Sequence, residues 1–89
     1  MEIDKAVKII QMSLTPLEKK ILKHIINTNE VFTNKELSET LNIDRGTVRR
    51  CTWRLHRDKH IFRYQVGNIR YYGSESSINQ LRLKLNRGS

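Results

Sequence analysis

The sequence predicts an α+β fold that is mostly helical, in which one short β-hairpin accompanies five helices. Helix-start signals recur along the chain, and after Lys59 the spacing of apolar residues changes to a period of two. Basic residues are concentrated in the second half of the chain. A chain of 89 residues has room for one small apolar core, so we expect residues 1–89 to form a single domain.

Three helix starts have the pattern of a capping box, in which an N-cap oxygen is followed three residues later by Glu or Gln. They are Thr15-Pro-Leu-Glu18, Thr33-Asn-Lys-Glu36 and Ser77-Ile-Asn-Gln80. Pro16 suits the first helical position because its missing N–H would have no partner there. Asp44 is a fourth N-cap, and its carboxylate suits the positive end of a helix dipole.

These starts and the apolar spacing predict helices at about 2–12, 16–28, 34–41, 45–57 and 78–86. The helix at 16–28 carries the widest apolar face, which consists of Leu17, Ile21, Leu22, Ile25 and Ile26. Ile43, between the third and fourth helices, is expected to be buried. Two β-rich runs, 61–66 and 69–72, flank Gly67-Asn68, which predicts a tight hairpin with a two-residue loop.

The fourth helix, RGTVRRCTWRLHR, separates its residues onto two faces when it is wound at about 100° per residue. Val48, Thr52 and Leu55 share the packed face, with Cys51 at its margin. The opposite face carries Gly46, Arg49, Arg50, Trp53 and Arg57, with Arg54 beside them.

The positive charge is segregated along the chain. Residues 1–44 contain six Lys or Arg and seven Asp or Glu, whereas residues 45–89 contain eleven and two. Solubility alone does not require such segregation. A polyanion is the natural partner of this surface, since its binding releases condensed counterions.

Several other classes of protein find little support in the sequence. No apolar run approaches the roughly 18 residues of a membrane span, and the first residues do not resemble a secretory signal. A lone cysteine forms no internal disulfide, so we expect a cytoplasmic protein that does not act at a membrane. Cys51 is expected to act as a small hydrophobe, with a redox sensor as the alternative.

An enzyme is not expected, because the chain has no glycine-rich phosphate loop and no nucleophile motif. His24, His56 and His60 lack partners at metal-ligand spacing. We therefore expect no metal, no cofactor and no small-molecule ligand.

Residues 15–73 place a helix, a short helix, a tight turn, a basic helix and a hairpin in succession, and this order resembles a known family. It is similar to the winged helix-turn-helix domains of prokaryotic transcription regulators, such as the MarR-like and ArsR-like groups. The matching segments are 33–37, 41–44, 45–50 and 55–61. The resemblance implies a winged helix-turn-helix core at 15–73 with a short two-stranded wing, an extra N-terminal helix at 1–14 and an extra C-terminal helix at 74–89.

The resemblance also implies a site. In such domains the second helix of the motif lies in the major groove of double-stranded DNA, and its N-terminal part meets base edges. Arginine can grip a guanine edge or a phosphate with two hydrogen bonds, and a glycine permits close approach. A basic face that contacts only solvent is the alternative. The expected DNA-binding residues are Arg45, Gly46, Thr47, Arg49, Arg50, Trp53, Arg54 and Arg57, together with Asn68 and Arg70 on the wing.

Trp53 and the wing leave alternatives open. Trp53 packs inside the domain, presses on a sugar or a base methyl group, or acts as the aromatic residue does in winged helices that bind left-handed duplexes. The last group uses a proline-bearing wing, whereas the only proline of this chain is Pro16. The two-residue tip at Asn68 is short, so Asn68 and Arg70 are expected to contact phosphate.

The terminal helices are expected to form a homodimer, because paired recognition helices contact two half-sites about 34 Å apart. The apolar stripes that suggest this are Ile3, Val7, Ile10 and Leu14, and Ile78, Leu81 and Leu85. The function that the sequence favours is a small homodimeric transcription regulator that binds double-stranded DNA sequence-specifically. A DNA-binding adaptor for plasmid partition or replication is one alternative, and a winged-helix protein–protein assembly module is another.

Overall fold

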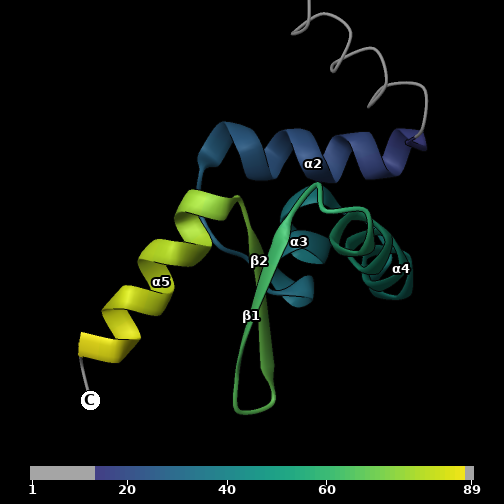
Figure 1. The fold of residues 1–89 in the computed structure, drawn as a ribbon. Coiled ribbons are helices and arrows are strands. Elements are labelled where there is room, and N and C mark those ends of the chain that lie inside the picture. The colour runs from purple at the N-terminus through teal and green to yellow at the C-terminus, as the bar shows by residue number, and fades with distance from the viewer. Residues whose placement is uncertain (1–13, 88–89) are drawn as a thin grey trace, which may run out of the picture.

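The computed structural model describes residues 14–87 and contains four helices and one hairpin in the order α2, α3, α4, β1, β2, α5 (Figure 1). The helices are α2 (Pro16–Thr28), α3 (Asn34–Leu41), α4 (Arg45–Arg57) and α5 (Glu75–Arg87). The strands are β1 (Phe62–Val66) and β2 (Ile69–Gly73). The mostly helical α+β fold predicted from the sequence is confirmed, and the expected helix at 2–12 lies outside the described residues.

The helices α2 and α3 begin at the two capping boxes that the sequence predicts. The amide of Glu18 donates to Thr15 Oγ1 at 3.2 Å, and the amide of Thr15 donates to Glu18 Oε1 at 2.9 Å. Thr33 and Glu36 repeat this exchange at 3.1 and 2.9 Å. Each reciprocal pair satisfies two amides that would otherwise have no partner at the helix end.

A three-residue turn of Asn42, Ile43 and Asp44 joins α3 to α4. Asn42 ends α3 in the left-handed region with φ 54°, which asparagine tolerates better than most residues. The amide of Ile43 donates to the Ser38 carbonyl at 3.1 Å, and the Ser38 hydroxyl donates to the Ile43 carbonyl at 2.6 Å. The side chain of Ile43 is buried, as expected, so the turn is anchored at its centre.

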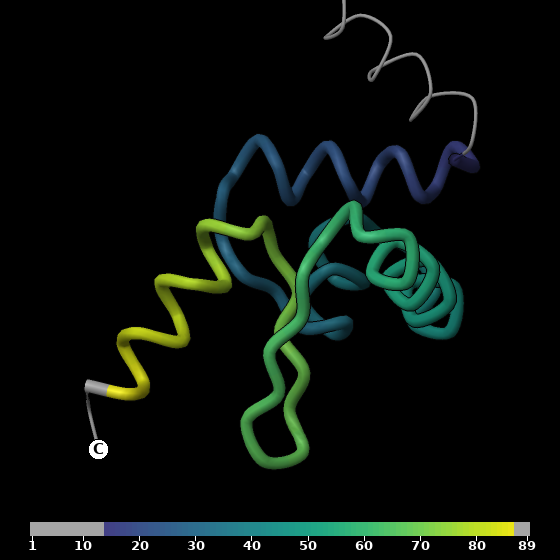
Figure 2. Tube along the Cα trace, viewed as in Figure 1, coloured from purple at the N-terminus to yellow at the C-terminus, as the bar shows by residue number. Residues whose placement is uncertain are grey.

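The hairpin is antiparallel, and Val66 pairs with Ile69 across the loop Gly67-Asn68. Gly67 has φ 60° whereas Asn68 does not have positive φ, which is the pattern of a type II′ turn. The loop lies at the end of the hairpin that is distant from α2 (Figure 2). The tight two-residue wing predicted from the sequence is therefore confirmed.

Phe32, in the link between α2 and α3, forms a bridge to Tyr72 of β2 that the sequence did not reveal. The amide of Phe32 donates to the Tyr72 carbonyl at 2.8 Å, and the amide of Tyr72 donates back at 2.7 Å. These two bonds attach the hairpin to the helices of the domain.

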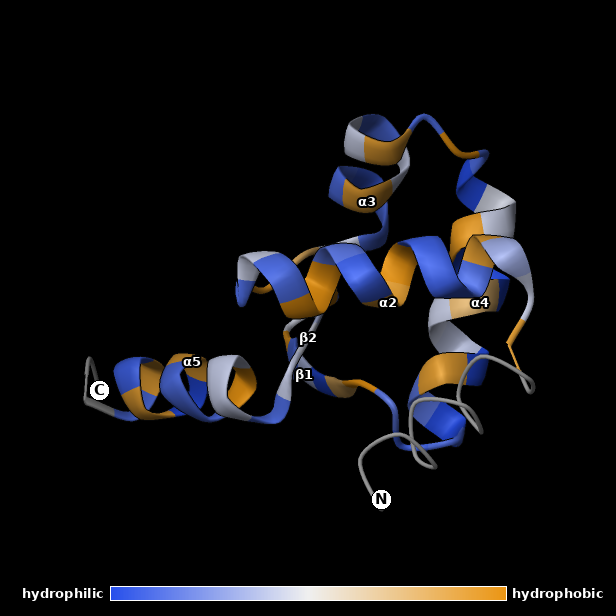
Figure 3. Ribbon diagram, turned by 90° about the horizontal axis from the view of Figure 1, so that it is seen from above, coloured by the Kyte–Doolittle hydropathy of each residue, from blue (hydrophilic) through white to orange (hydrophobic). Residues whose placement is uncertain are grey.

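The core is formed where α2, α3, α4 and the base of the hairpin meet, and Ile21, Ile25, Leu37, Val48 and Leu55 are fully buried in it. Apolar and polar residues alternate along α2 (Figure 3). The apolar face of α2 is narrower than expected, because its margins at Leu17 and Ile26 are exposed.

The helix α5 begins at Glu75, three residues before the expected start, and the predicted capping box at Ser77 is wrong. Ser74 is the residue that caps the helix, since the amide of Ser77 donates to Ser74 Oγ at 3.3 Å. Ser77 lies inside the first turn and is buried. The run Ser74-Glu75-Ser76-Ser77 offers several cap residues, and Gln80 completed the box pattern for the wrong one.

Two residues assigned to dimer contacts belong to the core of the chain itself. Leu14 is only 7% exposed and Ile78 only 2% exposed. The helix α5 packs on both strands of the hairpin, on the side opposite α4, and Ile78 is buried on it (Figure 1). The assignment of Leu14 and Ile78 to a dimer surface is therefore wrong.

Thr52 generates a prediction about how α3 and α4 are held together. Its hydroxyl is fully buried and donates to Asn34 Oδ1, at the start of α3, at 2.8 Å. Thr52→Val keeps the shape but leaves the Asn34 oxygen without this donor, so we expect about 1–3 kcal/mol less stability in urea unfolding. Thr40→Val is the matched control, because Thr40 is exposed on α3. Equal stability of the two variants would contradict the role of this bond.

Candidate nucleic-acid interface

The helix α4 has one buried face and one exposed face, and the division is the one that the sequence predicts. Val48, Cys51, Thr52 and Leu55 are buried against α2 and α3. The exposed residues of α4 include all five of its arginines and its tryptophan, namely Arg45, Arg49, Arg50, Trp53, Arg54 and Arg57. Packing of the apolar face thus turns the basic face toward solvent.

The N-terminal turn of α4 is held by Asp44. Its Oδ2 accepts from the amide of Thr47 at 3.2 Å, and Thr47 Oγ1 accepts from Arg50 Nη2 at 3.2 Å. These contacts fix the start of the helix and the direction of the Arg50 side chain.

Gly46 is half-buried beside the same cap, and a Cβ at this position would lie 3.2 Å from Asp44 Oδ2. Such a contact is tighter than usual, so the cap itself favours a small residue here. The sequence suggested only that a glycine would let DNA approach closely.

Arg54 lies against α2 through an ion pair that the sequence did not reveal. Its Nε is 3.8 Å from Oε2 of Glu18, whose side chain is 3% exposed whereas that of Arg54 is 51% exposed. Glu18 therefore caps α2 and also orients one arginine of α4. The rest of the Arg54 guanidinium remains accessible to another anion.

The positive charge of Arg57 is partly neutralised by the neighbouring residue Asp58. Its Nε donates to Asp58 Oδ1 at 3.1 Å, and its guanidinium carbon lies 5.2 Å from the centre of the Trp53 ring. The hydrogen bond from Arg57 holds the pKa of Asp58 below its usual value. A phosphate that binds Arg57 has to compete with this carboxylate.

Trp53 is 55% exposed, so its packing inside the domain, one of the alternatives left open by the sequence, is wrong. It lies at a groove of about 370 Å³ between α4 and β2. Within residues 14–87, the guanidinium groups of Arg49 and Arg70 have no hydrogen-bond or ion-pair partner. The groove is lined by Arg49, Arg50, Trp53, Arg54, Arg70 and Tyr72.

The wing contributes Arg70 and Asn68 in different ways. Arg70 pairs with Gln65 across the hairpin and lines the groove beside α4. Asn68 is exposed at the loop and does not line the groove. The structure therefore brings Arg70, but not Asn68, together with the arginines of α4.

Cys51 is buried on the packed side of α4, as a small hydrophobic residue would be. Burial, and then the charge of Glu18, raises the pKa of its thiol. The thiolate needed for redox chemistry is therefore disfavoured. Burial, and then the charge of Arg63, lowers the pKa of His56, so this residue adds little positive charge at neutral pH.

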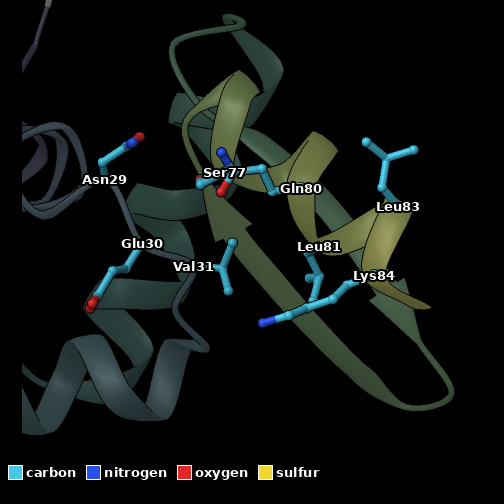
Figure 4. A pocket seen from close by; sticks show the side chains of 8 residues that line it. All are labelled: Asn29, Glu30, Val31, Ser77, Gln80, Leu81, Leu83 and Lys84. Carbon is cyan, nitrogen blue, oxygen red and sulfur yellow. The ribbon is translucent and has the colours of Figure 1, made fainter. Parts of the chain in front are cut away.

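A second hollow, of about 490 Å³, lies between α5 and the segment that links α2 to α3 (Figure 4). Its side chains come from these two regions of the chain, with Val31 and Leu81 among the apolar ones.

No group of three or more His, Cys, Asp or Glu that could hold a metal ion occurs in residues 14–87. None of the described helices is long and apolar enough to cross a membrane.

The helices of the site match a known protein family. Residues 14–58, which cover α2, α3 and α4, match the profile of the family described as winged helix-turn-helix DNA-binding. No curated protein and no solved structure is significantly similar to this chain.

Proposed function

The chain belongs to the winged helix-turn-helix DNA-binding family, and from this premise we propose that residues 1–89 form a single-domain, homodimeric transcription regulator. It binds double-stranded DNA sequence-specifically. The observation that carries the proposal is the exposed basic face of α4, in which five arginines lie on the helix that such domains insert into the major groove.

Base recognition is assigned to the first half of α4. Arg45, Arg49 and Arg50 are exposed within the first two turns after the Asp44 cap, where a recognition helix meets base edges. Thr47 adds a hydroxyl and a methyl group at the same end. Arg50 is already directed by its hydrogen bond to Thr47, so less side-chain freedom is lost on binding.

Phosphate contact is assigned to the second half of α4 and to the wing. Arg54 and Arg57 lie further from the helix start, and Arg70, on β2, lines the groove together with Arg54. Asn68, at the exposed loop, contacts the neighbouring phosphate backbone of the DNA. Arg70 is expected to contribute more than Arg57, because Asp58 competes for Arg57 whereas Arg70 has no internal partner among the described residues.

Dimerisation is assigned to the terminal segments. In the C-terminal helix α5, Leu81 is half-buried and Leu85 is exposed. The apolar hollow beside Leu81 supports a partner contact at this end of the domain. Ile3, Val7 and Ile10, which complete the proposed surface, lie outside the described residues.

Binding to duplex DNA should weaken steeply as the salt concentration rises. If a dimer neutralises about six phosphates, the logarithm of the association constant should fall with a slope near −5 against the logarithm of salt concentration. Fluorescence anisotropy with a labelled duplex measures the slope. A slope near zero, or no binding at low salt, would remove DNA as the partner.

The arginines of the site should not be equivalent. Arg49→Ala or Arg50→Ala should lower affinity for the specific duplex by about 1–3 kcal/mol and relax discrimination at one base position. Arg70→Ala should weaken binding to the specific and the scrambled duplex equally and reduce the salt slope by about one unit.

Competition binding with matched and scrambled duplexes separates these outcomes. Arg82→Ala is the control, since Arg82 lies on α5 over the ring of Tyr64 and outside the proposed interface. Equal losses on both duplexes for all three interface variants would show that α4 acts only as an electrostatic platform.

The proposed dimer surface gives a further prediction. Leu85→Ser should shift the protein toward the monomer in sedimentation equilibrium, because it removes an apolar group from the partner contact. Ile26→Ser is the control, since Ile26 is also an exposed apolar residue but lies on α2 and does not line the hollow beside Leu81. A wild-type protein that is monomeric at micromolar concentration would contradict the assignment.

A further inference from the structure

The groove between α4 and β2 combines two kinds of surface in one place. Its inner wall includes Tyr72, which is almost fully buried, and the indole of Trp53. Four arginines complete its lining, and one of them, Arg70, comes from the wing. A volume of about 370 Å³ is near the lower end of the roughly 300–1,000 Å³ typical of small-ligand sites, and it is far more than a single methyl group fills.

Trp53 lines this groove and is among the exposed large hydrophobic residues of the domain. The guanidinium of Arg57 lies over the ring at 5.2 Å, yet 55% of the residue remains exposed. An indole gains from contact with a second planar group, which removes apolar area from water. Its exposure beside four cations therefore indicates a ligand that is both planar and anionic.

The arginines of the groove differ in whether their guanidinium groups already have a partner in the domain. Arg54 is oriented by Glu18, and Arg50 donates to Thr47. The guanidinium groups of Arg49 and Arg70 have no partner within residues 14–87. Two planar guanidinium groups that lack acceptors match the oxygens of a phosphodiester.

Within DNA, the partner proposed above, a nucleotide has both properties, since it joins a flat base to a phosphate. In a fully paired duplex the faces of the bases are stacked on one another, and only their edges are accessible in the grooves. An unpaired nucleotide exposes the face of its base, and stacking on an aromatic side chain is how proteins hold single-stranded DNA.

We propose that this groove binds one unpaired nucleotide of a DNA strand, with its base against Trp53 and its phosphate between Arg70 and the arginines of α4. The inference rests on the proposed function, because α4 and the wing are the elements that contact the duplex. The protein then prefers a duplex that contains an unpaired nucleotide over the same duplex fully paired.

Trp53 is the only tryptophan of the chain, so its fluorescence reports directly on the groove. The probes are a fully paired duplex, the same duplex with one additional unpaired thymidine, and free thymidine monophosphate. The bulged duplex should bind about 5- to 150-fold more tightly than the paired one, as expected for one stacked base, and it should quench the fluorescence more strongly.

Variants test whether the indole causes the preference. In anisotropy measurements with labelled DNA, Trp53→Ala should reduce the ratio of the two affinities to about one, and Trp53→Phe should retain part of it. Ile26→Ala is the control, because Ile26 is equally exposed, at 57%, but lies on α2 outside the groove. The ratio of the affinities of Ile26→Ala for the bulged and the paired duplex should equal that of the wild type.

Two outcomes would overturn the proposal. One is equal affinity and equal quenching for the paired and bulged duplexes. The other is quenching by free thymidine monophosphate without any preference for the bulge, which would make the groove a site for free nucleotides. Failure of the proposed function gives a different result, because the protein would then not bind the paired duplex. If the protein bound only the bulged duplex, the assignment of the groove as a site for an unpaired nucleotide would still be supported.

Discussion

A narrow stripe of buried residues keeps α4, a helix that carries five arginines, packed in the fold. Val48, Cys51, Thr52 and Leu55 form this buried side, and Thr52 is also held by its hydrogen bond to Asn34. Burial of a Val or Leu side chain contributes about 1.5–3 kcal/mol, which is enough to fix the rotation of the helix about its axis. Once that rotation is fixed, the five arginines and Trp53 have to face solvent. The basic surface is therefore a consequence of how the opposite side packs.

Placement of a few acidic groups refines this arrangement. Asp44 caps α4 and orders the contacts of Thr47 and Arg50, and the nearly buried Glu18 orients Arg54. Asp58 instead neutralises part of Arg57. Ion pairs at the surface contribute little stability, so their main effect here is on direction and availability of the guanidinium groups. The arginines of α4 consequently differ in readiness to bind an anion, with Arg49 the one in the groove that has no internal partner among the described residues.

Local patterns in the sequence predicted most of the helix starts, the two faces of α4 and the hairpin loop, because each is determined by residues within about one or two turns of one another. The start of α5 was missed because three serines in four residues compete for the cap, and the choice depends on where β2 ends. Contacts between distant segments were not predictable in this way. The bridge between Phe32 and Tyr72, the pair of Glu18 with Arg54 and the groove that joins Arg70 to Trp53 all require the tertiary fold. The burial of Ile78 was missed for the same reason, since an apolar stripe is the same whether it covers its own hairpin or a partner.

The bridge at Tyr72 connects the core to the proposed nucleotide site. Tyr72 belongs to the core cluster, pairs with Phe32 through two backbone hydrogen bonds, and lines the groove beside Trp53. The wing strand is thus attached to the helices of the domain at a point only two residues from Arg70. The bridge thus places the strand that carries Arg70 at a set position relative to the helices. A site formed by two elements needs such a fixed spacing to hold a base and its phosphate at once, and the bridge supplies it.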